Sequence, residues 1–500
     1  MRSLSRVCIA VVLPASIAAC GQTVDLGWYP PRKTDINNLT AALNGEGVYG
    51  FIFNTSETPD DLYGTYNWCN MPHVRKTEYV KAPGQYELQY VEILNSPRQI
   101  QRHHKRTPYA SNAFPVEPYR WDCDDQGLFY YGQPLSDGSK QAAEGYWRGF
   151  ASAANPFVPS GWVGTCSFPQ ITTGGLDDSW THGEDLYGVY HDLLGFLPGR
   201  GDDWRGKVAY RVTNNVITSQ VAGMLVGGTW GTADRIPLLI QAAGVDSLEP
   251  QYGCRAGSAL SGDIRSGPGW REHLDRGADL FAALDGVSGV PPGDAGFHAS
   301  FDHYFDNLSA RQCHAKPLPC RLAGGRNSTD CVGQALADAV YRMGQWEYSH
   351  IYRDAGEASL AASVASYGVW VAELSAHLRD AMAGKEGAPI YVHNIAHDGS
   401  TSRLLSILQV DVMVWPGMGT EIVFELYTKR GEVETHENEK TSESGHYVRV
   451  LFGGRTLRSS NPSLGLIDML PVETLLAYFD GLVGKDANLI KGKCDGSIPL

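Results

Sequence analysis

The stretch Arg102-His103-His104-Lys105-Arg106-Thr107-Pro108 places five basic side chains in seven residues. The whole chain has 500 residues and a formal net charge of -14, so this run is an exception in an acidic protein. Such a run forms either a solvated basic patch or a pocket for an anion, because guanidinium groups match the oxygens of phosphates and carboxylates. The segments around it decide between these two interpretations.

A strand is predicted over 86–94, ahead of the basic run, and a second buried strand is predicted over 389–396. His397-Asp398 follows the second strand directly. In open α/β sheets, ligands bind outside the carboxyl ends of the strands, and both polar groups occupy that kind of position. Arginines hold phosphoryl oxygens, a neutral imidazole attacks phosphorus, and an aspartate protonates a leaving alcohol. The combination favours a pocket for a phosphomonoester.

The sequence here resembles the histidine acid phosphatases, whose signature Arg-His-Gly-x-Arg-x-Pro follows the first core strand and is paired with a late His-Asp. The resemblance covers roughly 85–240 and 385–480, and includes the stretches 171–175, 194–198 and 415–421. It implies a two-step hydrolysis through phospho-His103 without a metal or cofactor. It further implies that Arg102, Arg106 and His397 bind the phosphoryl group and that Asp398 donates the proton.

Three departures from the family pattern set this chain apart. His104 stands where the family has glycine, and its ring either forms a wall of the pocket or points away. No arginine occurs in 213–219, where the family usually has another pocket arginine, although Arg211 lies slightly earlier. The segment 95–101 separates the strand from the signature, and its Pro97 would interrupt a central strand. That segment is either a loop insertion or a retained intron fragment.

The predicted fold is α/β, with a mixed, mainly parallel central sheet flanked by helices and an inserted, mainly helical cap. Helices are predicted over 176–197, 214–227, 334–348 and 360–383, and further strands over 48–53, 208–212, 421–427 and 447–452. We predict a signal peptide over 1–20, an N-terminal extension over 21–84, a core formed by 85–245 and 386–500, and a helical cap over 246–385. The aromatic, turn-rich excursion 109–170 is expected to line a cleft.

The first twenty residues combine basic Arg2 and Arg6, a short apolar run and small residues, which is typical of a secretory signal. A bacterial lipobox around Cys20 is the alternative. Eight cysteines remain beyond residue 20, an even number that predicts up to four disulfides, with one pair expected among Cys313, Cys320 and Cys331. A zinc site at Cys313-His314 with Cys320 is the weaker interpretation. Sequons at Asn38, Asn54, Asn307 and Asn327 agree with a secreted glycoprotein.

We therefore predict a secreted acid phosphatase acting on a small-molecule phosphomonoester. The acidic balance argues against nucleic acid as a partner, and no apolar stretch is long enough for a membrane span. Two alternatives remain: a catalytically impaired binding protein on the same scaffold, and a hydrolase of a sugar substrate that redeploys carboxylates such as Asp398. A helix cap is the structural alternative for Asp398, whereas His393 is predicted to be a core histidine and His182, His191 and His446 are predicted to be structural or surface residues.

Overall fold

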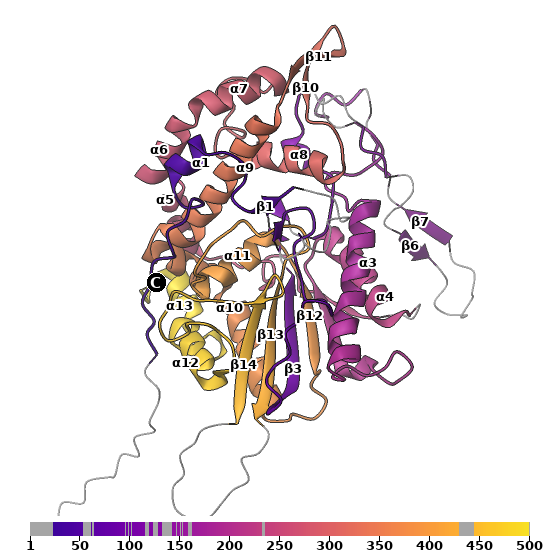
Figure 1. The fold of residues 1–500 in the computed structure, drawn as a ribbon, viewed down its shortest axis with the longest axis vertical. Helices are drawn as coiled ribbons and strands as arrows, with labels where there is room; N and C mark the ends of the chain where they lie inside the picture. The colour runs from indigo at the N-terminus through magenta and orange to yellow at the C-terminus, as the bar shows by residue number, and fades with distance from the viewer. Residues whose placement is uncertain are drawn as a thin grey trace, which may run out of the picture.

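The computed structural model describes residues 24–499, apart from 54–61, 63–64, 96, 99, 102, 116–119, 124–128, 133–142, 147, 151, 153, 159–162, 233–235 and 430–444. A mixed sheet of eight strands forms its centre, in the order β15-β14-β13-β3-β12-β8-β9, with β16 beside β14 (Figure 1). The strands are β3 (Tyr86–Asn95), β8 (Val208–Val212), β9 (Leu238–Leu239), β12 (Tyr391–Ile395), β13 (Glu421–Lys429), β14 (His446–Phe452), β15 (Arg455–Thr456) and β16 (Leu470–Pro471). The predicted α/β class is confirmed.

The register of the parallel strands brings three chain segments to one edge of the sheet. Strands β3, β12, β8 and β9 are parallel, while β13 and β14 are antiparallel to their neighbours. Ile395 at the end of β12 is paired with Asn95 of β3 and with Val212 of β8. The residues that directly follow these strands, among them Thr213 and His397-Asp398, therefore emerge together, while the basic run follows β3 only after the segment 95–101.

Helices cover both faces of the sheet because the strands present apolar side chains on both. One core packs Val91 and Ile93 of β3 under α3 (Thr173–Tyr187) and α4 (Val216–Trp230). The other core packs Tyr90 and Leu94 under helices of the opposite layer. Those helices include α10 (Glu357–Met382), α11 (Asp398–Ile407), α12 (Val472–Val483) and α13 (Ile490–Asp495). Figure 1 shows the two helical layers on either side of the strands.

The helix predicted over 176–197 is shorter than expected. It begins at Thr173, after the N-cap Thr172, and its α-helical part ends at Tyr187. A π-helical turn, Gly188–Leu193, continues it, so the backbone hydrogen bonds change register where the sequence pattern does not. The helix predicted over 214–227 is α4, which begins after the N-cap Asn215 and runs to Trp230.

The segment predicted as a cap is mainly helical. It contains α5 (Arg255–Ile264), α6 (Pro268–Arg276), α7 (Ala278–Ser288), α8 (Asp302–Cys313), α9 (Gln334–Ser349), a π-helical turn (His350–Asp354) and most of α10. A hairpin of β10 (Cys320–Ala323) and β11 (Arg326–Cys331) projects from it (Figure 1). The helices predicted over 334–348 and 360–383 are α9 and α10. The domain boundaries remain a prediction.

The segment between β3 and the basic run folds outside the central sheet. Strand β3 ends at Asn95, and β4 (Pro97–Arg98) pairs antiparallel with β5 (Ile100–Gln101) in a small hairpin that lies against α11. Pro97 thus begins a new strand rather than interrupting the central one. The segment 95–101 is an inserted hairpin beside the helix that carries Asp398.

Short elements make up the N-terminal extension and the excursion. The extension contains α1 (Leu39–Asn44), and the strand predicted over 48–53 is reduced to β1 (Phe51–Ile52), which pairs with β2 (Tyr66–Asn67). The excursion contains a 3-10 turn (Ala110–Asn112) and the hairpin of β6 (Phe129–Gly132) and β7 (Ala143–Tyr146). Further 3-10 turns cover Arg205–Lys207 and Lys485–Ala487.

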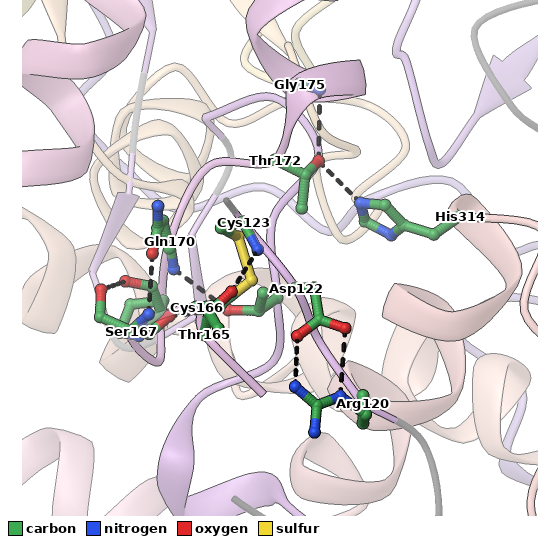
Figure 2. The surroundings of a disulfide bond; sticks show 12 residues. Arg120, Asp122, Cys123, Thr165, Cys166, Ser167, Gln170, Thr172, Gly175 and His314 are labelled. Atoms are coloured by element: carbon green, nitrogen blue, oxygen red, sulfur yellow. Dashed lines mark hydrogen bonds and ion pairs between the residues drawn. A yellow bond between two sulfur atoms is a disulfide. The ribbon is translucent and has the colours of Figure 1, made fainter. Parts of the chain in front are cut away.

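All eight cysteines beyond residue 20 form disulfides, as predicted. The pairs are Cys69–Cys313, Cys123–Cys166, Cys254–Cys494 and Cys320–Cys331. The expected pair within the 313–331 cluster is Cys320–Cys331, which closes the β10–β11 hairpin. Figure 2 shows Cys123–Cys166 beside Thr165, whose hydroxyl accepts the Cys123 backbone N–H. In the described part of the chain, no group of histidine, cysteine and carboxylate side chains is suited to hold a metal ion.

The predicted signal peptide lies outside the described residues. Within the described residues, the structure contains no helix with the length and apolar character needed to cross a bilayer. Two of the sequons, Asn38 and Asn327, have exposed side chains, and Asn54 lies outside the described residues. Asn307 is fully buried: its amide donates to the Asn112 carbonyl and accepts from Arg311 Nε, both at 2.9 Å. The folded chain therefore offers no access to Asn307 for a glycan.

Candidate active site

The loop 103–108 and the start of α11 lie at the carboxyl ends of the parallel strands β3, β12 and β8. His103, Arg106, His397 and Asp398 are all at most 2% exposed. Arg102 lies outside the described residues, so its predicted phosphoryl contact remains a prediction. The side chains that contact these four residues come mainly from the loops between elements and from helices α8 and α9.

His103 is held in one tautomer by its own loop. Its Nδ1 contacts the backbone carbonyl oxygen of His104 and must donate there, since a carbonyl only accepts. In the neutral ring the lone pair is therefore on Nε2, and Arg106 Nε donates to it at 2.9 Å. An imidazole in this tautomer has an electron pair that could attack phosphorus once Arg106 Nε releases it.

Arg106 has a carboxylate partner that the sequence did not predict. Its NH2 group lies 2.8 Å from Asp306 Oδ1 on α8, and its NH1 lies 3.3 Å from Oδ2. Asp306 Oδ2 also accepts the Tyr109 backbone N–H at 3.1 Å and the Asn112 amide at 2.8 Å. Burial acts to lower the pKa of Arg106, but Asp306 outweighs it, with a smaller contribution from Asp398, and raises that pKa above its ordinary value. Arg106 is thus a buried cation whose charge is already matched.

Asp398 begins α11 and is bonded from two sides. Its Oδ2 accepts the Tyr348 hydroxyl at 3.0 Å and the Trp415 indole N–H at 2.8 Å. The rings of Tyr348 and Trp415 stack at 4.2 Å, so the two donors are mutually fixed. The carboxyl group of Asp398 is within electrostatic range of the Arg106 guanidinium.

His397 makes contacts that differ from its predicted role. Its Nε2 lies 2.7 Å from the Thr213 hydroxyl and 3.5 Å from Glu249 Oε2. Thr213 follows β8 and is fully buried. A carboxylate therefore lies on the side of the site where a phosphate-binding arginine was expected.

The missing arginine has no substitute from β8. Arg211 points away from the site and pairs with Glu373 at 2.7 Å and with Asp246 at 3.3 Å. Asn214 is exposed, and Asn215 accepts the Ile217 backbone N–H as the N-cap of α4. The prediction that Arg211 lies too early in the sequence to serve the pocket agrees with these contacts.

The ring of His104, whose direction the sequence left open, is turned toward the core. Its Nδ1 lies 2.8 Å from the Ser179 hydroxyl and its Nε2 lies 3.3 Å from His182 Nδ1, both on α3. His182 is buried, and its Nε2 lies 3.0 Å from Glu421 Oε2. His393 is also buried, and its Nδ1 lies 2.9 Å from the Tyr391 hydroxyl.

A cavity of about 310 Å³ lies on the Asp398 side of the site. Tyr348, which bonds Asp398, forms part of its lining. Asp302 and His303 line it from α8, one turn before Asp306, and Arg403 lines it from α11. Sequence reasoning did not find Asp306, Glu249, Thr213 and Tyr348, because their positions relative to the motifs depend on long-range packing.

No family model matches this sequence, and no curated protein matches it. Among solved structures, the chain aligns with the apo form of Hafnia alvei phytase at 13% identity and a TM-score of 0.49, over 81% of this chain and 99% of that one. It also aligns with the D. castellii phytase at 13% identity and a TM-score of 0.45, over 92% of each chain. A third match is the Bifidobacterium longum multiple inositol polyphosphate phosphatase in complex with inositol hexasulfate, at 11% identity and a TM-score of 0.43, over 79% of this chain and 93% of that one.

These matches are similarities of fold alone. The roles proposed for individual residues rest on the contacts within this chain.

Proposed function

We propose that the chain hydrolyses phosphomonoesters through a phosphohistidine intermediate on His103. The observation that carries this proposal is the tautomer of His103, whose Nδ1 proton is held by the His104 carbonyl while Nε2 carries the lone pair beside Arg106. A second group with acid–base chemistry, Asp398, starts the helix next to this loop. The nucleophile, the cation and the acid are thus supplied by residues 103, 106 and 398.

In the first step, His103 Nε2 attacks phosphorus, the bond from phosphorus to the ester oxygen breaks, and Asp398 in its acid form gives its proton to the leaving alcohol. In the second step, water attacks the phosphohistidine, Asp398 accepts the proton from that water, and the bond from Nε2 to phosphorus breaks. Arg106 carries the charge that would stabilise the phosphoryl oxygens.

The test is hydrolysis of a generic aryl phosphate at acid pH by the wild type and by His103→Ala. We expect the variant to lose activity by more than about 10³-fold, because the nucleophile is removed. His191→Ala, on the π-helical turn remote from the site, is the matched control and should retain activity. Equal hydrolysis by wild type and His103→Ala would overturn the mechanism.

A binding protein without turnover is the second candidate, and a specific observation favours it. Asp306 already neutralises Arg106, and Glu249 lies 3.5 Å from His397 Nε2, so a phosphate dianion would meet two carboxylates. Calorimetry with phosphate and with vanadate, beside the activity assay, separates the candidates. Binding of either anion without any hydrolysis would support this second function.

We also propose that the protein is secreted. Four disulfides are typical of proteins that fold in an oxidising compartment, and the N-terminal sequence has the composition of a secretory signal. Determining the N-terminal residue of the protein purified from culture medium tests this; a mature chain that begins after residue 18 would support it.

A further inference from the structure

A cavity of about 260 Å³ lies beside the edge strand β15, away from the candidate active site. Phe452 of β14 and Arg455 and Thr456 of β15 line it, and β14 and β13 separate β15 from β3 in the order of the sheet. Its lining includes none of the residues proposed for phosphoryl transfer. A ligand held in this cavity is therefore bound independently of the proposed phosphatase reaction.

Three arginines and one carboxylate line this cavity. Arg32 reaches it from the N-terminal extension, Arg455 from β15 and Arg458 from the segment that follows. Within the described part of the chain, the guanidinium groups of Arg455 and Arg458 have no hydrogen-bond or ion-pair partner. Asp411 is the one acidic residue of the described lining, so two positive charges are in excess in a chain of formal net charge -14. A cleft lined by one sign of charge concentrates ions of the opposite sign.

Asp411 neutralises only part of this charge. Arg32 Nε lies 3.4 Å from Asp411 Oδ2, and the two side chains are 65% and 21% exposed. The contact is long and single, whereas a guanidinium can form two parallel hydrogen bonds with a carboxylate or a phosphate. An exposed ion pair of this kind contributes little to stability, so a ligand with several charged oxygens displaces it at small cost.

Two of the arginines lie near the same tyrosine. Burial raises the pKa of Tyr66 above its ordinary value, and Arg455 and Arg32 act against burial. Both guanidinium groups are therefore within electrostatic range of a ring that lines the cavity. The hydroxyl groups of Tyr66 and Thr456 add neutral hydrogen-bond donors to the lining.

Backbone hydrogen bonds connect the segments that carry these arginines. The Arg32 N–H donates to the Asp411 carbonyl at 2.8 Å, and the Asp411 N–H donates to the Arg458 carbonyl at 2.9 Å. Met71 and Leu457, which are at most 3% exposed, complete the lining with buried apolar side chains. Because the backbone around the cavity is already fixed, an anion that binds there has only side chains to order.

We propose that this cavity is a second anion site, which binds a small oxyanion with at least two negative charges, either a phosphoryl compound or a carboxylate. The planar guanidinium groups match the oxygens of both kinds of anion. The volume lies just below the roughly 300–1,000 Å³ of common small-molecule sites, which favours a small ligand over an extended chain. Because its arginines come from the N-terminal extension and from the edge of the central sheet, a bound anion connects these two parts of the fold.

The test is calorimetry of the full chain at pH 8 and constant ionic strength, with inorganic phosphate and with citrate as probes. We expect a saturable site whose affinity falls at least about tenfold in Arg455→Gln and in Arg458→Gln, because each change removes a charge-assisted hydrogen bond. Binding of phosphate alone identifies a phosphoryl ligand, binding of citrate alone identifies a carboxylate ligand, and binding of both identifies a site that accepts either oxyanion. Arg321→Gln and Arg326→Gln are the matched controls, since they remove the same charge from exposed positions of the β10–β11 hairpin.

Arg32 and Asp411 give expectations of opposite sign. Arg32→Gln should weaken the binding, whereas Lys33→Gln, at the next residue and outside the lining, should not. Asp411→Asn should tighten the binding by up to about fivefold, because it removes the carboxylate that competes for Arg32. Thermal unfolding without added anion should be the same in all these variants and in the wild type, since the substituted side chains are exposed or partly exposed.

The absence of saturable binding by both probes would overturn the inference. So would an affinity that is unchanged in Arg455→Gln and Arg458→Gln, as expected if the anion binds at the candidate active site instead, or an affinity that falls equally in the hairpin controls. Hydrolysis is a separate readout. A chain that hydrolyses no phosphomonoester, yet binds either probe through Arg455 and Arg458, would contradict the proposed function and support this second site.

Discussion

Asp306 decides how much of the charge of Arg106 is available to a ligand. The pair is buried on both sides, with side chains at most 2% exposed, and Asp306 is further held by Tyr109 and Asn112. A buried ion pair adds little net stability, but removal of one partner leaves an uncompensated charge. An anion bound next to Arg106 would thus compete with Asp306 for the same guanidinium.

Asp306→Asn tests this competition. We expect the free energy of unfolding to fall by about 3–5 kcal/mol, because the Arg106 charge is left buried without a matching carboxylate. Added phosphate should recover more stability in the variant than in the wild type, since the anion then supplies the missing charge. Urea unfolding with and without phosphate measures both effects. Asp302→Asn, one turn earlier on α8 and partly exposed, is the control; an equal gain from phosphate in wild type and Asp306→Asn would contradict the prediction.

The local motifs predicted which residues gather at the site, but not their partners. His397 and Asp398 directly follow β12, and His103 and Arg106 follow β3 after a short hairpin, so parallel strand pairing brings the two stretches to the same end of the sheet. Asp306 and Tyr348 reach the site from helices α8 and α9, whose packing depends on many weak apolar contacts. Nothing in the spacing of a helix reports that Asp306 will meet an arginine 200 residues away, or that the Tyr348 hydroxyl will meet a carboxylate 50 residues away.

The start of α4 is the element in which this chain departs most from the predicted pocket. Thr213 contacts His397, Asn214 is exposed, and Asn215 caps the helix through its side-chain oxygen. Cationic side chains at such a helix start meet the positive end of the helix dipole, so an arginine there is tolerated only where it gains an anion. In this structure a carboxylate, Glu249, lies 3.5 Å from His397 Nε2 instead.

Asn214→Arg should restore an anion contact from this element. We expect phosphate binding to tighten by about 1.5–3 kcal/mol, or roughly tenfold to a hundredfold, through one charge-assisted hydrogen bond. Calorimetry at constant ionic strength measures the change. Gly223→Arg is the control, because it adds the same charge at an exposed position later in α4 where a Cβ meets no neighbour. The prediction is wrong if both variants change the affinity equally.

The element boundaries show where sequence patterns are sufficient. Strand β8 was predicted with its observed limits, and β3 and β12 differ from prediction by a few residues, because apolar runs end at polar or turn-forming residues. The helix over 176–197 was predicted as one element, but it changes to a π-helical turn at Gly188. The apolar period continues through both parts, so only the backbone hydrogen bonds distinguish them. The β4–β5 hairpin was recognised as an insertion through Pro97, but not as a strand pair.

At the scale of the molecule, the site is attached to a sheet that is packed on both faces. Glu421, the first residue of β13, is a buried group that links the sheet to the site. It contacts His182, which in turn contacts His104 of the loop 103–108. Burial raises the pKa of Glu421 to about 7, which has a consequence for global stability. A carboxyl group with a folded-state pKa above its unfolded value contributes stability that is complete below the unfolded pKa and is lost as the pH rises through the folded one.

We therefore expect the Glu421 contribution to stability to decline between pH 4.5 and about 7. Glu421→Gln should flatten this decline, because an amide donates to His182 and accepts from Val74 without a proton to lose. Thermal unfolding at pH 5 and pH 8 measures the difference between the two proteins. Glu92→Gln is the control, since Glu92 is a buried carboxylate of β3 that contacts His377 at 3.1 Å, outside this cluster. An unchanged pH dependence in Glu421→Gln would contradict the prediction.

The buried sequon in α8 sets a condition on how the chain matures. Asn307 lies next to Asp306, and its amide is bonded within the fold, yet Asn307-Leu308-Ser309 is an acceptor sequence wherever it is exposed. In a secretory compartment, folding of α8 and transfer of a glycan to the nascent chain are competing reactions on the same side chain. A glycan added first would block the packing of α8 and the seating of Asp306. In such a compartment α8 would have to fold before a glycan is transferred to Asn307. A glycan on Asn307 would identify the molecules in which the transfer came first.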